Sequence, residues 1–125
     1  MKRLRSMFSS NTQDCGPNLR DRDGHCAKRL VEAGAVLLDV RSPAEFASGH
    51  ITGALNIPHT DLPGRIDELR KAQGGDPGTA VVIYCKSGGR AGMAKRYLLS
   101  QGYGSVMNLR DRDGHCAKRL VEAGA

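Results

Sequence analysis

The stretch from residue 80 to residue 102 constrains the fold of this chain more than any other. It opens with Ala80-Val81-Val82-Ile83-Tyr84, an unbroken apolar and β-branched run that is typical of a strand buried on both faces. It closes with apolar residues at helical spacing before Gly102, and the inward positions that this spacing predicts are Met93, Tyr97 and Leu98. Between them lies the loop Cys85-Lys86-Ser87-Gly88-Gly89-Arg90. The stretch therefore predicts a strand, a loop that begins with a thiol, and a helix.

This loop has the composition of an anion site beside a nucleophile. Consecutive backbone N–H groups in a tight loop and at a helix start favour negative charge, and therefore favour thiolate over thiol at Cys85. Glycine permits positive φ and a close approach of the backbone to a bound atom, and arginine can hold an oxyanion through two hydrogen bonds. The alternative is a buried structural cysteine before an ordinary turn. The composition favours a catalytic Cys85 with substrate bound by Lys86, Ser87, Gly88, Gly89 and Arg90.

Two motifs resemble those of the rhodanese-like sulfurtransferases. The cysteine loop is similar to that family's C-x-x-G-x-R active-site loop. Residues 39–58, DVRSPAEFASGHITGALNIP, match its signature D-x-R-x-x-x-E-F-x-x-G-H-I-x-G-A-x-N-I-P, and the resemblance covers residues 24–109. It implies an α/β fold of three layers, α/β/α, with a small central, mainly parallel sheet. It also implies transfer of a sulfane sulfur through a persulfide on Cys85.

Asp39, Arg41 and His50 lie in the upstream motif. Asp39 and Arg41 are two residues apart at a strand end and project to the same side. Arg41 either helps to neutralise the substrate or, in the interpretation that we favour, pairs with Asp39 to brace neighbouring loops. His50 has no adjacent acidic residue that would make it a general base, so we interpret it as a second bracing residue. All three are expected to support the site indirectly.

Strand and helix patterns alternate along the chain. Asp23 is a candidate N-cap for a helix stopped by Gly34, with Cys26, Ala27, Leu30 and Ala33 inward. Ser42-Pro43-Ala44-Glu45 predicts a helix start with a capping box. Thr60 or Asp61 can cap a helix whose inward residues are Leu62, Ile66 and Leu69, and residues 73–78 form a loop. Further strands are predicted over residues 36–38, 54–57 and 105–107, and this alternation predicts a parallel sheet.

Composition excludes several classes of protein. A chain of 125 residues suffices for one domain. Its net charge of +6 is spread along the chain and only 4% of its residues are aromatic, so we expect affinity for small anions rather than nucleic acid. No stretch has the length of a membrane span. The basic N-terminus lacks the apolar segment of a secretory signal and is short for a mitochondrial presequence, so we expect a cytoplasmic protein.

The spacing of the four cysteines argues against a disulfide scaffold. The Cys and His spacings do not match a zinc site either, and we expect no metal or other cofactor. His25-Cys26 and His115-Cys116 are adjacent pairs that point to different faces of a helix, which favours structural or surface roles. A reducing compartment suits a chain whose working group is a thiol.

An internal repeat is the unusual feature of the chain. Residues 18–35 and 108–125 both read NLRDRDGHCAKRLVEAGA. We expect residues 1–17 to form a mobile tail, residues 18–109 to form the domain, and the second copy to add a C-terminal helix through Ala117, Leu120 and Val121. Alternatively the second copy competes with the first for the one first-helix site on the sheet, or it swaps into a neighbouring molecule. The protein is then expected to be a monomer or a swapped dimer.

Four functions are compatible with these motifs. The first is an enzyme that moves sulfur from a small anionic, thiosulfate-like donor to cyanide or a thiol. The second is a persulfide carrier that serves a protein acceptor, and the third is a regulatory module without turnover. The fourth is phosphoryl transfer, but related phosphatases hold Cys and Arg across a loop one residue longer than the one here, which counts against it.

Overall fold

A computed structural model describes residues 24–86 and 88–109 of the chain. The elements in chain order are α3 (Gly24–Glu32), β1 (Val36–Asp39), α4 (Pro43–Ala47), β2 (Leu55–Asn56), the 3₁₀ helix η1 (Leu62–Arg65), α5 (Ile66–Ala72), β3 (Val81–Tyr84), α6 (Gly89–Ser100) and β4 (Val106–Asn108). No helix within these described ranges combines the length and the apolar composition needed to cross a bilayer.

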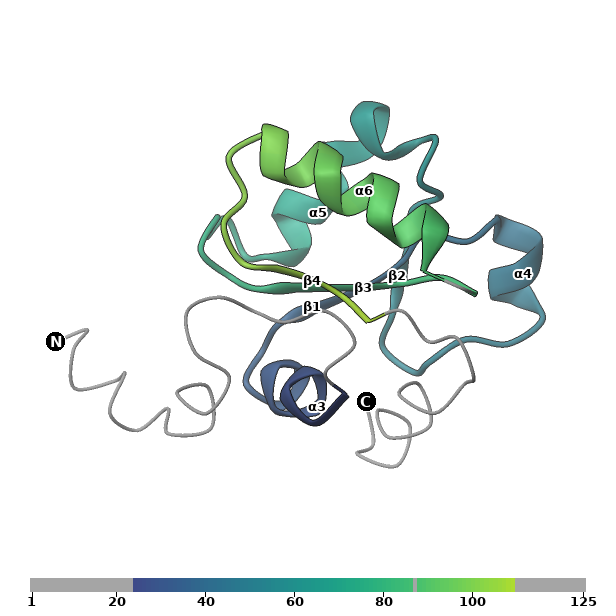
Figure 1. The fold of residues 1–125 in the computed structure, drawn as a ribbon, viewed down its shortest axis with the longest axis horizontal. Helices are drawn as coiled ribbons and strands as arrows, with labels where there is room; N and C mark the ends of the chain where they lie inside the picture. Colours follow the sequence, from purple (N-terminus) through teal and green to yellow (C-terminus); the bar gives the residue numbers. More distant parts are fainter. Residues whose placement is uncertain (1–23, 87, 110–125) are drawn as a thin grey trace, which may run out of the picture.

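The four strands form one parallel sheet in the order β2-β1-β3-β4. Helix α3 covers one face, and α5 and α6 cover the other, while α4 lies beyond one end of the strands (Figure 1). The predicted fold class, a three-layer α/β/α arrangement around a small parallel sheet, is confirmed. Parallel strands need helical crossovers on the faces of the sheet, which explains why every strand except β2 is buried along its whole length.

Alternate residues of the strands enter two apolar layers. Towards α5 and α6 the buried residues include Leu38, Ile57, Leu62, Leu69, Val81, Ile83, Cys85, Ala91, Ala94 and Leu98. Towards α3 they include Cys26, Ala27, Leu30, Leu37, Val82, Tyr84, Met107 and Leu109. Burying one such large aliphatic side chain contributes roughly 1.5–3 kcal/mol to stability, so these two layers hold the sheet in place. Cys85 belongs to the layer beneath α6.

Local signals set several of the helix ends as predicted. The Ser42 side chain accepts the backbone N–H of Glu45, and the Glu45 side chain accepts the backbone N–H of Ser42, which confirms the capping box. Gly34 and Gly102 follow α3 and α6 with φ of 108° and 91°, a conformation that glycine adopts without strain. The predicted loop over residues 73–78 is also present.

Three details of the sequence-based prediction are wrong. Met93 is 53% exposed and Ala33 is exposed, whereas both were expected to face inward. The buried face of α6 consists of Ala91, Ala94 and Leu98, because small alanines let the helix lie close to the sheet. Asp61 precedes the 3₁₀ helix η1 and makes no side-chain cap hydrogen bond.

One cysteine of the described residues is disulfide-bonded. Cys26 in α3 is buried and disulfide-bonded, whereas Cys85 is a free thiol. The spacing argument against a disulfide scaffold did not address such a single bond, because spacing along the chain does not reveal which cysteines the fold brings together.

The expected roles of residues 1–17, of Asp23 and of the helix in the second repeat copy lie outside the described residues. The first two residues of that copy are described. Asn108 is the last residue of β4, and Leu109 is fully buried and donates its N–H to the Ile83 carbonyl at 2.8 Å. The second copy therefore begins inside the sheet and the core.

Candidate active site

Cys85 lies directly after β3 at the carboxyl edge of the sheet. From β1 the chain runs outward to β2 and then crosses back to β3 and β4, so the strand order reverses between β1 and β3. Ligands of open parallel sheets bind outside the carboxyl ends of strands at such a reversal. Cys85 is only 3% exposed, and its thiol lies under the start of α6. The fold thus places the candidate nucleophile at the expected ligand site.

Two backbone groups donate to the Cys85 sulfur. The N–H of Gly88 lies 3.0 Å from Sγ and that of Ala91 lies 3.4 Å from it. Gly88 is the N-cap of α6 with φ of 98°, so a residue with a side chain would be strained there. N–H donors at a helix N-terminus stabilise negative charge on sulfur more than they stabilise a neutral thiol. The loop can therefore hold a thiolate, or a persulfide that extends from it.

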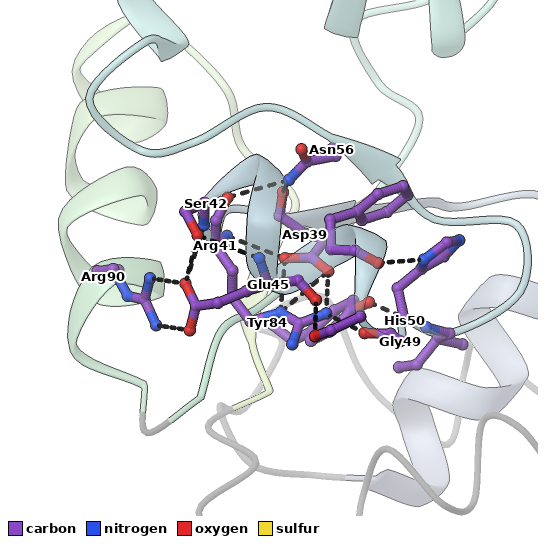
Figure 2. Close-up of polar contacts among 12 residues, drawn as sticks. Asp39, Arg41, Ser42, Glu45, Gly49, His50, Asn56, Tyr84 and Arg90 are labelled. Atoms are coloured by element: carbon purple, nitrogen blue, oxygen red, sulfur yellow. Dashed lines mark hydrogen bonds and ion pairs between the residues drawn. The ribbon is translucent and has the colours of Figure 1, made fainter.

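Arg90 is held by Glu45 of α4 rather than pointing freely at the sulfur (Figure 2). Its Nη1 and Nη2 donate to Oε1 and Oε2 of Glu45 at 2.6 and 3.1 Å. This pairing raises the pKa of Arg90, and the charge of Cys85 acts in the same direction. The Arg90 hydrogen bond, followed by that from the Ser42 N–H, lowers the pKa of the Glu45 carboxyl to about 2. The start of α6 therefore carries a fixed cation.

Lys86 is exposed at the opening of the loop, and Ser87 lies outside the described residues. Gly88 is a buried residue of the loop, whereas Gly89 is exposed at the first position of α6. Of the expected substrate-binding residues, Gly88 contacts the Cys85 sulfur through its N–H, Lys86 presents an exposed charge, and Arg90 carries a charge that is restrained by Glu45.

Asp39 and Arg41 pair with each other at the end of β1 (Figure 2). Asp39 is fully buried and accepts the Arg41 backbone N–H at 2.9 Å, Nε at 3.0 and 3.1 Å, and Nη2 at 2.7 Å. This pairing raises the pKa of Arg41. Arg41 Nη2 also donates to the Gly49 carbonyl at 2.7 Å, so the pair joins β1 to the loop after α4.

His50 contacts α4 rather than the cysteine loop. Its Nδ1 lies 2.8 Å from the Phe46 carbonyl oxygen, and its ring stacks on the Phe46 ring with centroids 3.5 Å apart. A carbonyl oxygen can only accept, so Nδ1 carries the hydrogen in this contact. These contacts hold the segment after α4 in place at the exposed edge of the site.

Two residues contribute to the site in ways that the sequence analysis missed. Tyr84 was interpreted only as a strand residue, but its hydroxyl accepts the buried N–H of Ile51 at 3.1 Å and its ring lies 5.6 Å from the Arg41 guanidinium carbon. Burial raises the pKa of Tyr84. Glu45 was interpreted as a helix cap, and its second role as the Arg90 partner was not foreseen. Its position six residues after Asp39 in the upstream motif was the available signal.

Within residues 24–86 and 88–109, no three His, Cys, Asp or Glu side chains lie close enough to hold a metal ion. The groups available at the site are instead a thiol, backbone N–H donors and cations. Such a set suits nucleophilic attack on an anionic substrate.

Comparison with known proteins agrees with this geometry. The sequence profile of the rhodanese-like domain matches residues 24–111 of this chain. The chain belongs to the rhodanese-like family. Its rhodanese-like domain is 46% identical over 85 residues to a sulfurtransferase of Allochromatium vinosum, which covers 67% of this chain and 74% of that protein. It is 36% identical over 83 residues to the thiosulfate sulfurtransferase GlpE of Pseudomonas fluorescens, covering 66% and 71% of the two chains.

Solved structures show the same rhodanese-like fold. The human single-domain sulfurtransferase TSTD1 superposes with a TM-score of 0.57 at 30% identity, covering 75% of this chain and 89% of that one. The reduced CoADR-RHD of Bacillus anthracis superposes with a TM-score of 0.61 at 27% identity, covering 84% of this chain and 17% of that one. TSTD1 and the two sequence relatives are named sulfurtransferases.

Proposed function

We propose that this protein is a thiosulfate sulfurtransferase that carries sulfane sulfur as a persulfide on Cys85. The observation that carries the proposal is the free Cys85 thiol, whose sulfur accepts the Gly88 N–H at 3.0 Å beside the N-terminus of α6. The relative named thiosulfate sulfurtransferase supports the same reaction class.

The reaction has two displacement steps. The Cys85 thiolate attacks the outer sulfur of thiosulfate, the S–S bond of thiosulfate breaks, and its electron pair leaves with sulfite. The product on the enzyme is a Cys85 persulfide anion. Cyanide or a thiolate then attacks the terminal sulfur, forms thiocyanate or a new persulfide, and returns the Cys85 thiolate. No external oxidant or reductant is needed, because each step transfers a neutral sulfur atom between two nucleophiles.

The loop residues have different tasks in this scheme. Lys86 attracts the dianionic donor, and the N–H groups of Gly88 and Ala91 stabilise negative charge on the Cys85 sulfur. Arg90 contributes a fixed positive charge because Glu45 restrains it. Cys85 is 3% exposed, so the donor must present a small terminal sulfur rather than a bulky group. Asp39, Arg41 and His50 hold the surrounding segments in position.

Intact mass spectrometry tests the reaction. After treatment with thiosulfate, the protein should gain the mass of one sulfur atom, and cyanide should remove it with formation of thiocyanate. The Cys85→Ser variant should fold normally and take up no cyanide-labile sulfur, since the backbone donors do not depend on the sulfur atom. Cyanide-labile sulfur on Cys85→Ser would overturn the proposal, and so would a wild-type protein that stays unmodified. A persulfide that forms but passes only to another protein would identify a carrier instead.

A further inference from the structure

Asn108 is a buried amide beside the cysteine strand. It is the last residue of β4 and is 1% exposed. Its backbone pairs with Ile83 of β3, two residues before Cys85. Burying an amide is costly unless it forms hydrogen bonds, so its contacts identify what it does.

The Asn108 side chain is joined to the cysteine loop. Its Nδ2 donates to the Gly88 carbonyl oxygen at 3.0 Å, and the same oxygen accepts the Gly92 N–H at 2.8 Å. On the other side of the same residue, the Gly88 N–H donates to Cys85 Sγ at 3.0 Å. Gly88 is therefore fixed at its carbonyl by β4 and α6, and its N–H points at the sulfur.

We propose that Asn108 is a positioning residue that keeps the Gly88 N–H directed at the Cys85 sulfur. The inference extends the proposed sulfur transfer, because among the described residues the Gly88 N–H lies closer to the Cys85 sulfur than the Ala91 N–H does.

Gly88 needs such an anchor because it is intrinsically flexible. Glycine populates several φ and ψ regions at similar energy, so nothing in Gly88 itself selects φ of 98° and ψ of −13°. The N-cap of α6 has no side-chain hydrogen bond of its own. Gly92 has no Cβ, and an added Cβ would lie 3.5 Å from Asn108 Nδ2, so α6 passes directly over the amide. The amide of β4 thereby adds a second restraint on the Gly88 carbonyl to that of the Gly92 N–H.

The pH profile of Cys85 alkylation by iodoacetamide tests this role. The modified Cys85 peptide is quantified by mass spectrometry at each pH. The plateau at high pH reports access to the sulfur, and the midpoint reports stabilisation of the thiolate. For Asn108→Leu, which removes the donor at similar volume, the midpoint should move to higher pH. The rate of Cys85 alkylation at pH 7, relative to the plateau rate, should fall about tenfold. This is the effect expected when one hydrogen bond to a charged group is weakened.

A matched control separates positioning from general stability. Gln73 is also a buried amide, 5% exposed, and its Nε2 donates to the Thr79 carbonyl at 2.8 Å. Gln73 precedes β3 and Cys85 follows β3, so the two residues lie at opposite ends of this strand. Gln73→Met should lower the thermal midpoint as Asn108→Leu does but leave the alkylation profile unchanged.

Asn108→Asp provides the second variant, should Asn108→Leu fail to fold. A carboxylate keeps the shape of the amide but places an acceptor against the Gly88 carbonyl. The midpoint of Cys85 alkylation in Asn108→Asp should therefore move to higher pH by at least as much as in Asn108→Leu. A profile for Asn108→Asp or a folded Asn108→Leu that matches wild type would overturn the inference. The inference would also fail if Gln73→Met shifted the profile equally. Alkylation needs no sulfur donor, so this result stands apart from the test of sulfur transfer.

Discussion

The Glu45 carboxylate and the Arg90 guanidinium form a bidentate ion pair that joins α4 to α6 across 45 residues of sequence. It joins the upstream motif to the cysteine loop, because Glu45 also caps α4 through Ser42. The pair therefore fixes the end of the cysteine loop relative to the segment that carries Asp39 and Arg41.

The Glu45–Arg90 pair should make stability depend on pH. The pKa of Glu45 is about 2 in the folded protein and about 4.5 when the group is unperturbed. A lowered folded pKa adds stability that is fully present above pH 4.5 and is lost as pH falls toward 2. Glu45→Gln should therefore unfold more easily than wild type in urea at neutral pH, and the difference should shrink through that window. A difference that stays constant down to pH 2 would contradict the pairing.

Lys86 should influence binding of the donor without affecting the fold. It is exposed, so Lys86→Ala should leave the thermal midpoint unchanged and raise KM for thiosulfate several-fold, with a smaller effect in high salt. Steady-state kinetics at two ionic strengths measure this. Lys71→Ala in α5 is the matched control, since it removes the same charge from an exposed site at the opposite edge of the sheet. Equal effects of the two substitutions would show that only net charge matters.

Removal of the hydroxyl group should affect stability differently at Tyr84 and at Tyr103. Tyr84 accepts the Ile51 N–H, and Ile51 is 3% exposed, so Tyr84→Phe leaves a buried donor unpaired and should cost about 1–3 kcal/mol. Among the described residues, the Tyr103 hydroxyl is buried and has no hydrogen-bond partner. Tyr103→Phe should therefore leave stability unchanged or increase it. Thermal unfolding measures both, and a large loss for Tyr103→Phe would show that its hydroxyl is paired.

The start of the second repeat copy should be required for the fold. Truncation after Leu109 keeps the Asn108 amide, the buried Leu109 side chain and its bond to Ile83, so Cys85 should still take up sulfur from thiosulfate. Truncation after Met107 removes all three and should lower the unfolding free energy by at least about 2 kcal/mol, the contribution of one buried leucine. Urea unfolding and the mass assay measure the two outcomes. Equal stability of the two truncated chains would contradict this role.

Patterns within short stretches of the sequence were sufficient to predict several local elements of this fold. The buried run of β3, the glycines after Cys85 and the capping box at Ser42 each encode their structure through neighbouring residues. These signals depend on backbone sterics and local hydrogen bonds, so they can be read without knowing the rest of the fold. They placed a cysteine at a helix start, at the carboxyl end of a parallel strand.

The tertiary structure alone decided which polar groups meet around that cysteine. Glu45 reaches Arg90, the Tyr84 hydroxyl reaches Ile51, and Asn108 reaches Gly88, across 45, 33 and 20 residues of sequence. The exposure of Met93 was decided in the same way, by how closely Ala91 and Ala94 let α6 approach the sheet. Such partners follow from strand order, register and helix packing, which depend on the whole apolar core. No local pattern specifies them, because each side chain's partner is set by the position of an element far away in sequence.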